Sequence, residues 1–512
     1  MTDTLTRRIR DQFTRSDLLF ALLAGLVGVA GSYAVAGYTR QFVVAPIDAL
    51  VVRATPGPVV AFMIENVGEQ GHLIHIALSF AIGIGVLAGT AGAGLLVARR
   101  AEEPVAGVLF AGILAWGVVA AITFEPLLAL GAGLPVALFT AVGAAPTAAP
   151  EHDPSRRRAL VSGASALAFV GVAAGFGRLV SGGSGSGTDA EGGGGDEKEM
   201  DEEVATLMTE AEGKSLDIQG NIPGLVSTFE EFYNVDIAEF DPDLSAEDWS
   251  LTFTGEVGEE RELTFADLQE MPTERRFVTL RCVGEDLNGH KLDTAVWTGT
   301  PIKPLLEEVD PGGDCGCAML RAEDDYFVQF PIEAMEDGFL AWGMNGQSLP
   351  QSHGHPVRVL IPGHWGETNV KWLSEIELLE EEMDGYWEQR GWHGTGPVNT
   401  VAKLWSDTTL ENGNVELAGH AYAGTRGVER VEVSTDGGDS WTDAELSEPL
   451  PGEDVWRQWR HEFEPDGSHE IVIRAVDGEG TLQPQEESDS FPSGASGWVS
   501  KTVNPMDSMG ES

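Results

Sequence analysis

Long apolar runs dominate the first third of the chain, and an alternating apolar and polar pattern dominates the rest. The apolar runs span residues 18–38, 73–98, 104–124, 126–146 and 159–181. Crossing a bilayer takes about 20 apolar residues, and each run is near this length and nearly free of charged side chains. We therefore predict an α-helical membrane domain of about five transmembrane helices over residues 1–182.

Three arginine clusters indicate how this membrane domain is oriented. They lie at residues 7–15, before the first run, at residues 99–100, after the second, and at residues 156–158, before the fifth. With five spans all three fall on one side, which the positive-inside rule makes the inside. We expect a multi-pass protein of the cell membrane with its N-terminus inside and residues after 182 extracellular. The stretch SRRRAL at residues 155–160 also resembles a twin-arginine export signal, and positive-inside flanking explains it equally well.

Two histidines, His72 and His75, lie at the outer end of the second apolar run. Membrane histidines can bind haem b when a facing helix supplies a second ligand. The only other histidine before residue 182 is His152, in a predicted inside loop, so a polar pair near the interface is favoured over haem b. Residues 183–225, rich in Gly, Ser and acidic residues at their start, are expected to form a flexible linker.

Charge is distributed unevenly along the chain. Residues 1–182 hold 11 of the 81 acidic side chains and 12 of the 31 basic ones, so their net charge is +1 and that of the remainder is −51. Such an acidic surface repels nucleic acid and anionic lipid headgroups. Only seven basic residues are Lys, and an acidic, Lys-poor surface is typical of a halophilic protein, because salt screens the self-repulsion. Apolar and aromatic residues throughout residues 226–500 exclude a disordered tail.

From residue 248 onward the pattern is that of short strands and short helices. DWSLTFTGEV alternates, LTFADL reads as a capped helix, and residues 277–284 read as a buried strand ending in Cys282. A thiol beside Gly284 can reach a ligand, although a lone Cys is by itself more often a small buried residue. Cys315 and Cys317 cannot complete a zinc site and would form a tight disulfide, so we interpret them as structural or incidental.

The motifs around Cys282 resemble the sulfite oxidase family over about 280 residues. In chain order they are RCVG at 281–284, VWTGTPI at 296–302, FLAWGMNGQSLP at 339–350, GHPVRV at 354–359, IPG at 361–363 and VKWL at 370–373. Their order and spacing match the family throughout. The resemblance implies a mixed α+β domain around a molybdenum–molybdopterin cofactor, whose metal takes one thiolate from the protein, here that of Cys282.

The resemblance also implies residues that bind the cofactor. His353, Arg358 and the segment Asn369-Val370-Lys371 match positions that hold the pterin and its phosphate, a group that Arg and Lys complement. Arg358 lies between apolar residues of a predicted strand, where an unpaired charge would be costly. Asp325 matches a further pterin contact, and Asn234 matches the first cofactor contact of the family.

Three departures from the family bear on the substrate. Glu285 and Asp286 follow the Cys where sulfite oxidases carry arginines, and YNVD at 233–236 stands where the upstream motif of the family usually carries Arg and His. The stretch TFEEFYNVD at 228–236 resembles the bacterial membrane-associated methionine-sulfoxide reductase branch. Trp392 replaces the active-site Tyr of the family, and His393 beside it could supply a proton, although a solvent-facing loop histidine is the more common case. A dianion such as sulfite needs a cationic pocket. These changes therefore predict a neutral or cationic small-molecule oxygen donor or acceptor.

The last hundred residues alternate over several short segments separated by turns. Residues 428–434 are followed by the turn Asp436-Gly437-Gly438-Asp439. The pattern predicts an all-β immunoglobulin-like sandwich, and the resemblance implies that it is a dimerisation domain and the protein a homodimer. The predicted domains are membrane 1–182, linker 183–225, molybdopterin-binding 226–397 and dimerisation 398–505.

These features predict a membrane-anchored molybdopterin-dependent oxidoreductase that transfers an oxygen atom in a two-electron step. One alternative is a reductase of sulfoxides or similar S- or N-oxides with the same cofactor. Another is a cofactor-free binding module tethered to the membrane, against which Cys282, Arg358 and Lys371 argue together. No haem-binding domain or four-Cys cluster motif is visible, so electrons would pass through an external or membrane carrier.

Overall fold

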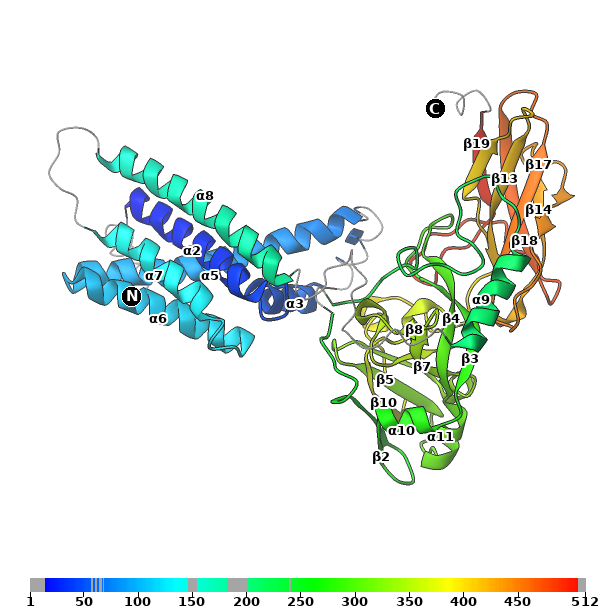
Figure 1. Cartoon of the computed structure of the whole chain (residues 1–512), viewed down its shortest axis with the longest axis horizontal. Coiled ribbons are helices and arrows are strands. Elements are labelled where there is room, and N and C mark those ends of the chain that lie inside the picture. The colour runs from blue at the N-terminus through cyan, green and yellow to red at the C-terminus, as the bar shows by residue number, and fades with distance from the viewer. Residues whose placement is uncertain are drawn as a thin grey trace. The chain divides into compact units, whose positions relative to one another are not determined.

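Figure 1 shows the chain as a computed structural model. The structure describes residues 14–56, 59, 62–63, 67, 69–145, 154–181, 201–238 and 241–504. The chain divides into two compact units, which are described separately. One contains the helices between residues 14 and 181, and the other contains residues 201–237 and 241–504.

The first unit is a bundle of helices. They are α2 (Arg15–Ala36), α3 (Val44–Ala54), α5 (Glu69–Arg100), α6 (Pro104–Thr123), α7 (Leu130–Ala144) and α8 (Pro154–Ser181). Among the described residues, three stretches are long and apolar enough to cross a membrane, namely Ser16–Ala36, Leu73–Arg100 and Pro104–Thr123. The other two predicted spans form shorter apolar helices, Leu130–Ala144 and Gly163–Arg178.

The fourth predicted span is shorter than expected because α6 ends sharply. Phe124 adopts a left-handed conformation with φ 57° and is followed by Glu125 and Pro126, so α7 begins only at Leu130 and has 15 residues. Small residues bring the longer helices together, as in helices that pack in lipid. A Cβ on Gly94 of α5 would lie 2.6 Å from the carbonyl oxygen of Gly107 in α6, so only glycine fits there.

Helix α3 lies within the stretch that we expected to be a loop between the first two spans. Its Asp48 is buried and accepts a 2.7 Å hydrogen bond from the Ser79 hydroxyl of α5. Nδ1 of His75 lies 3.0 Å from the same carboxylate oxygen. His75 therefore has the polar partner that we favoured for it. The side chain of His72 lies outside the described residues.

The second unit begins with α9 (Glu202–Lys214), within residues that we expected to form a flexible linker. Asp201 caps its N-terminus, and Val204 and Ala211 are buried in a core shared with the C-terminal strands. The backbone N–H of Leu216 donates to the Gln458 side chain at 3.0 Å. The linker prediction is therefore wrong for residues 201–225, and residues 182–200 lie outside the described residues.

Two sheets form the middle of the second unit. The first has the order β2-β1-β10-β5-β6, with β1 (Ser250–Gly255), β2 (Arg261–Thr264), β5 (Cys317–Ala322), β6 (Phe327–Pro331) and β10 (Leu373–Leu379). The second has the order β3-β4-β7-β8 with β9 on β7, and comprises β3 (Glu274–Arg281), β4 (Leu292–Pro301), β7 (Phe339–Met344), β8 (Gln347–Ser348) and β9 (Arg358–Leu360). Most pairs are antiparallel, but β1 and β10 are parallel.

Short helices connect these strands. They are α10 (Phe265–Glu270), α11 (Lys303–Val309) and α12 (Ile332–Met335). Helix α10 is the capped helix expected from the sequence, since Thr264 and Asp267 form a capping box. Strand β3 is the predicted buried strand, and it ends at Arg281, directly before Cys282. The mixed α+β architecture predicted for this domain is thus present.

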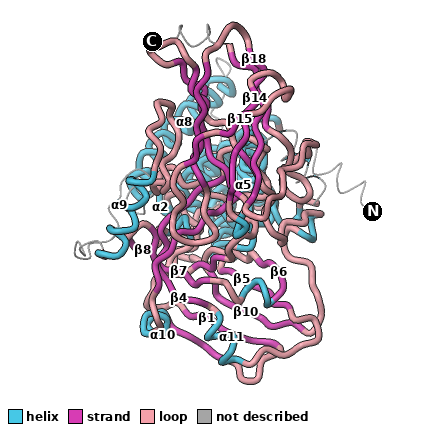
Figure 2. Tube along the Cα trace, turned by 90° about the vertical axis from the view of Figure 1, so that its right-hand side faces the viewer, coloured by secondary structure: helices cyan, strands magenta, loops and turns pink. Residues whose placement is uncertain are grey.

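Two antiparallel sheets form the C-terminal part, whose strands are magenta in the tube of Figure 2. One contains β11 (Val401–Ala402), β12 (Ser406–Thr409), β13 (Val415–Tyr422), β16 (Glu445–Leu446) and β17 (Arg457–Phe463). The other contains β14 (Val428–Ser434), β15 (Thr442–Asp443), β18 (His469–Asp477) and β19 (Val499–Val503). Leu417 and Trp459 of the first sheet share a core with Val431 and Ile473 of the second. The predicted turn at Asp436 joins β14 to β15, with φ 75° at Gly437.

Candidate functional site

A cavity of about 320 Å³ opens in the second unit beside the end of β3. Its charged lining residues are Asp236, Lys291, Asp324, Arg358, Glu367 and Lys371. Its aromatic lining residues are Phe232, Tyr233, Tyr326, Trp372, Trp387 and Trp392. Cys282 and Gly284 also line it. The end of β3, the start of β9 and five loop segments therefore meet at one cavity.

Cys282 presents a free thiol to this cavity. It directly follows β3, and its backbone N–H donates to the Lys291 carbonyl at 2.9 Å, which closes the loop between β3 and β4. Gly284 keeps the space beside the thiol open, since a Cβ there would lie 3.9 Å from Sγ. Burial raises the pKa of Cys282 to about 11, so the thiol is neutral unless a cation or a metal stabilises the thiolate.

Arg358 supplies a buried positive charge to the same cavity. Its Nη1 donates to the His353 carbonyl at 3.2 Å and its Nη2 to the Asn369 carbonyl at 2.8 Å. Its Nε is buried and has no hydrogen-bond partner among the described residues. Burial lowers the pKa of Arg358 to about 10, which still leaves the guanidinium charged. A charge with an unused donor fits an anionic ligand.

Lys371 is the second cation of the cavity wall. Its Nζ donates to the side chain of Asn234 and to Oδ2 of Asp236, the latter at 3.0 Å. Burial lowers the pKa of Lys371, while the Asp236 carboxylate raises it. The neighbouring Asn369 and Val370 also line the cavity, and their backbone carbonyls accept bonds from Arg358 and from the backbone of Val359. The segment predicted to hold an anion therefore lies in one wall.

His353 and Asp325 do not line the cavity. His353 is buried behind Arg358, and its Nδ1 is unpartnered within the described part of the chain. Burial lowers the pKa of His353 to about 3, so the ring is neutral. Asp325 is exposed, in a turn with φ 68°, and its neighbour Asp324 lines the cavity instead. Burial raises the pKa of Asp324 to about 6.

Trp392 and His393 were both expected to be catalytic, but the structure places only Trp392 at the cavity. Trp392 is buried, lines the cavity, and packs edge-on against Trp387 at 6.3 Å between ring centroids. Its Nε1 has no partner in the described structure. The side chain of His393 is exposed and not part of the lining, and its backbone N–H donates to the Pro492 carbonyl at 2.8 Å. The structure therefore does not bring His393 to the cavity.

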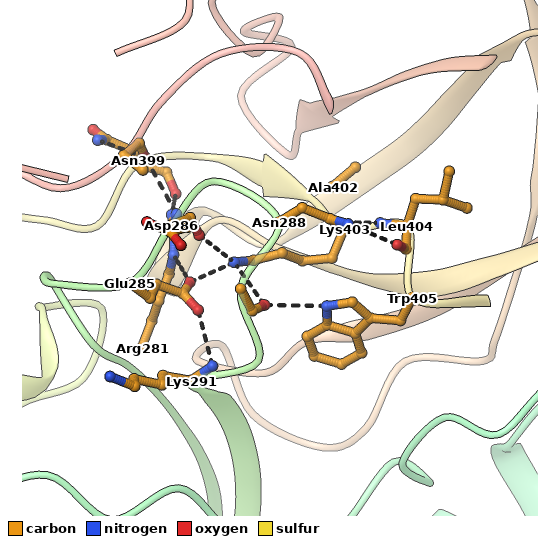
Figure 3. A network of polar contacts seen from close by, with 12 residues as sticks. Arg281, Glu285, Asp286, Asn288, Lys291, Asn399, Ala402, Lys403, Leu404 and Trp405 are labelled. Carbon is orange, nitrogen blue, oxygen red and sulfur yellow. Dashed lines mark hydrogen bonds and ion pairs between the residues drawn. The ribbon is translucent and has the colours of Figure 1, made fainter. Parts of the chain in front are cut away.

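Glu285 does not act on the cavity as its position beside Cys282 led us to expect. Figure 3 shows its carboxylate between Arg281 and Lys403, with distances of 2.8 Å and 2.5 Å. It is buried and absent from the cavity lining, and Asp286 is exposed. The expectation that both acids repel an anionic substrate is therefore wrong, because tertiary contacts neutralise Glu285.

Glu367 is a functional candidate that sequence reasoning missed. It lines the cavity, and both carboxylate oxygens are buried without a hydrogen-bond donor in the described structure. Burial and the neighbouring Glu388 raise its pKa well above the usual range. Tyr233 and Lys291 were also missed as lining residues. Tyr233 lies within the YNVD stretch, and Glu367 lies two residues before the Asn369-Val370-Lys371 segment. Their closeness to these motifs is the feature of the sequence that could have identified them.

Cys315 and Cys317 form a disulfide with Cα atoms 5.3 Å apart. Neither residue lines the cavity. The described residues contain no group of three or more His, Cys, Asp or Glu side chains that could by itself hold a metal ion. A metal at this site would therefore need ligands from a cofactor in addition to Cys282.

Comparison with known proteins agrees with this arrangement. Residues 238–387 match the oxidoreductase molybdopterin binding domain, and residues 397–493 match the Mo-co oxidoreductase dimerisation domain. The mitochondrial sulfite oxidase of Rattus norvegicus is 28% identical over 303 residues, which is 48% of this chain and 54% of that protein. The sulfite oxidase of Arabidopsis thaliana is 27% identical over 302 residues, covering 46% and 77%.

A nitrate reductase [NADH] of Spinacia oleracea is 28% identical over 316 residues, covering 48% of this chain and 34% of that protein. The chain spans about half the length of the first relatives it matches. The two matched domains follow each other here in the second unit, and most of the residues that line the cavity belong to the first of them. Residues 238–493 therefore comprise the molybdopterin-binding and dimerisation domains of the sulfite oxidase family of oxidoreductases.

Proposed function

We propose that this protein is a membrane-anchored molybdenum-cofactor oxidoreductase whose metal is held by the thiolate of Cys282. One observation carries the proposal: a free thiol and a buried guanidinium with an unused Nε line the same cavity of a molybdopterin-binding domain. A buried donor that is left without an acceptor, as the Nε of Arg358 is among the described residues, is costly. The cavity therefore fits a ligand that combines a thiophilic metal with a phosphate.

Different residues of this chain would bind different parts of the cofactor. Cys282 would bind the metal, and Arg358 and Lys371 would bind the phosphate. The buried His353, Asn234 and the backbone of Asn369-Val370 would support the pterin end through their contacts with these two cations. When bound, the cofactor supplies two-electron oxygen-atom transfer.

The other cavity residues would control water and protons. Trp387 and Trp392 form an aromatic wall that excludes water from the region of the thiol. Glu367 can keep a proton at neutral pH because its pKa is raised. Oxygen-atom transfer either releases or consumes protons when the oxygen exchanges with water. A buried carboxylic acid in the cavity wall is suited to hold one of them.

The charge balance of the cavity favours a neutral substrate. Its cations are Lys291, Arg358 and Lys371, and its carboxyl groups are Asp236, Asp324 and Glu367. Arg358 and Lys371 would be engaged by the cofactor phosphate, which leaves one lysine near the thiol. A dianion such as sulfite needs more positive charge than this. The same balance, with the aromatic wall, favours the second candidate function, reduction of sulfoxides or similar S- or N-oxides.

The wider setting is also part of the proposal. The protein would be a homodimer through residues 397–493. Its three candidate spans would anchor it in the cell membrane with the second unit outside. Electrons would be exchanged with an external or membrane carrier. The C-terminal sheets would form an immunoglobulin-like sandwich, and the lysine-poor acidic surface would suit high salt.

The test is metal analysis followed by paired assays. Protein purified as the full chain in detergent and high salt should contain about one molybdenum per chain, with pterin in equal amount. Sulfite oxidation and sulfoxide reduction are then measured side by side with artificial electron carriers. Faster sulfoxide reduction would support the second candidate, and faster sulfite oxidation would exclude it. Protein made with molybdate present but lacking molybdenum would mean a non-catalytic binding module.

A further inference from the structure

A buried cluster of charges ties the loop after Cys282 to the dimerisation domain (Figure 3). The loop runs from Cys282, at the end of β3, to Lys291, before β4. The backbone N–H of Cys282 donates to the Lys291 carbonyl at 2.9 Å, so the loop is closed at its base. Glu285 lies within it, and its side chain is 1% exposed.

Both carboxylate oxygens of Glu285 accept hydrogen bonds. Oε1 accepts from Nε of Arg281 at 2.8 Å and from Nζ of Lys403 at 2.5 Å. Oε2 accepts from the backbone N–H of Lys291 at 2.9 Å. Residues just before and at the end of the loop thus donate to the same carboxylate. The position of that carboxylate therefore influences both ends of the loop that carries the thiol.

Lys403 brings the dimerisation domain into this cluster. It follows β11, and its side chain is 0% exposed. Besides Glu285, its Nζ donates to the carbonyl of Gly289 at 3.2 Å, near the other end of the loop. Arg281 is bound to the same domain, since its Nη1 donates to the carbonyl of Asn399 at 2.9 Å. The loop is thus held from outside its own domain.

The cost of burying charged side chains favours the one arrangement in which each charge of this cluster has a partner. Buried charges lose their hydration and remain stable only with well-placed partners. Of the two buried cations on Glu285, Arg281 belongs to the strand before the thiol and Lys403 to the second domain. Removing Lys403 leaves the Glu285–Arg281 pair in place, so the carboxylate keeps a partner. Such a change should loosen the loop without unfolding the domain.

We propose that Lys403 is a positioning residue, which holds the Cys282 thiol in place for the cofactor through Glu285 and the loop between them. The inference rests on the proposed function of Cys282 as the metal ligand. Supporting contacts around a metal ligand commonly change metal affinity by about 10- to 100-fold when they are removed. A contribution of this kind from the second domain would make cofactor retention depend on correct assembly of the two domains.

The test compares three variants of the full chain. Lys403→Met removes the tie through Glu285. Asn288→Ala removes two other hydrogen bonds between the loop and the second domain, both to Leu404 at 2.8 Å, and leaves Glu285 intact. Lys501→Met removes an exposed ion pair of the same domain, to Asp407, and is the control. If Lys403→Met fails to fold, Glu285→Gln replaces it in the comparison, because it changes the other partner of the same contact.

Several measurements report on the thiol and on the metal separately from turnover. In protein produced without molybdate, the reaction of Cys282 with a disulfide reagent measures how the loop holds the thiol, because this is the one cysteine outside the disulfide. In the molybdenum-loaded protein, the metal retained after dialysis and the electron paramagnetic resonance spectrum of the one-electron-reduced metal report on the ligand geometry. Melting temperature reports on stability alone.

We expect Lys403→Met to change the thiol reaction rate and the metal retention by about tenfold and to shift the resonance spectrum. The control and Asn288→Ala should stay within about twofold. A Lys403→Met protein that melts earlier but matches the wild type in thiol rate, retention and spectrum would overturn the inference. Wild-type protein without molybdenum would instead count against the proposed function, and the thiol rates would still decide whether Lys403 positions Cys282.

Discussion

Glu367 and Glu388 are neighbouring carboxyl groups whose oxygens are all buried, and one of the two lies in the wall of the cavity. Two ionised carboxylates have no donor between them, so a proton on one of them would supply the donor that both lack. Burial and the charge of Glu388 raise the pKa of Glu367 well above its usual range, and burial raises the pKa of Glu388. The pair therefore stores a proton close to Cys282.

Replacing Glu367 by Gln should remove the pH dependence that this carboxyl group gives to the stability of the fold. The folded pKa of Glu367 is raised, so its contribution to stability is complete below the unfolded value of 4.5 and is lost as pH rises through the folded pKa. Glu367→Gln should thus be more stable than the wild type at pH 8 by about 1–3 kcal/mol, the cost of a buried group left unsatisfied. The gain should vanish at pH 4.

Tryptophan fluorescence during chemical unfolding measures this stability, since 12 of the 13 Trp residues follow residue 240. Glu381→Gln, an exposed acid, is the matched control. Equal stability gains at both pH values would contradict the shared-proton interpretation.

Cys282→Ser tests the ligand assignment directly. A serine hydroxyl has a much higher pKa than a thiol and is a poor ligand for a metal held by sulfur. We expect molybdenum content and turnover to fall below a few per cent of the wild type, while the cofactor-free protein loses less than about 1 kcal/mol, typical of a conservative change. Metal analysis and unfolding measure the two effects. Full molybdenum content in the variant would refute the assignment.

Arg358→Met tests the anion-binding role of the guanidinium. If the charge holds a phosphate, cofactor retention should fall by about 10-fold or more, comparable to the loss of one strong charged hydrogen bond. The cofactor-free protein should keep its stability or gain some, because a buried, partly unsatisfied cation is removed. Arg460→Met, which removes a surface pair with Glu445, is the control. A purely structural Arg358 would instead give a destabilised cofactor-free protein.

Asp454 should make the protein less stable as the solution becomes less acidic. It is buried, its Oδ1 accepts from the Tyr422 hydroxyl at 2.5 Å, and burial raises its pKa to about 7. The stability that it contributes is complete below about pH 4 and is lost as pH rises toward 7. Asp454→Asn should therefore be more stable than the wild type by up to about 4 kcal/mol at pH 8, because the pKa of Asp454 rises from 3.8 in the unfolded chain to about 7 in the folded protein. Unfolding at pH 4 and pH 8 measures the difference, which should be absent at pH 4.

Accessible tags test the membrane topology. With three or with five crossings, an N-terminus on the inside leaves residue 193 on the outside, because both numbers are odd. A tag next to Arg100, at the end of α5, should be protected from an impermeant reagent, and one next to Gly193 should react. Equal labelling of both tags from outside would contradict this orientation.

The sequence by itself determined the features that depend on local pattern. Long apolar runs identify the helices of the first unit, and three of them are long enough to span a membrane. Cys282, Arg358 and Lys371, which the sequence motifs identified, all line one cavity. Such features are readable because hydrophobic period, capping and short motifs act over neighbouring residues.

Only the tertiary structure decided what the charges do. Glu285 follows Cys282 closely, yet Lys403, 118 residues later, neutralises it and turns it away from the cavity lining. Burial and the neighbouring Glu388 raise the pKa of Glu367, and His393 is exposed although Trp392 before it is buried. The effect of a charged side chain depends on its burial and its partners. Contacts between distant segments set both, and no local pattern contains them.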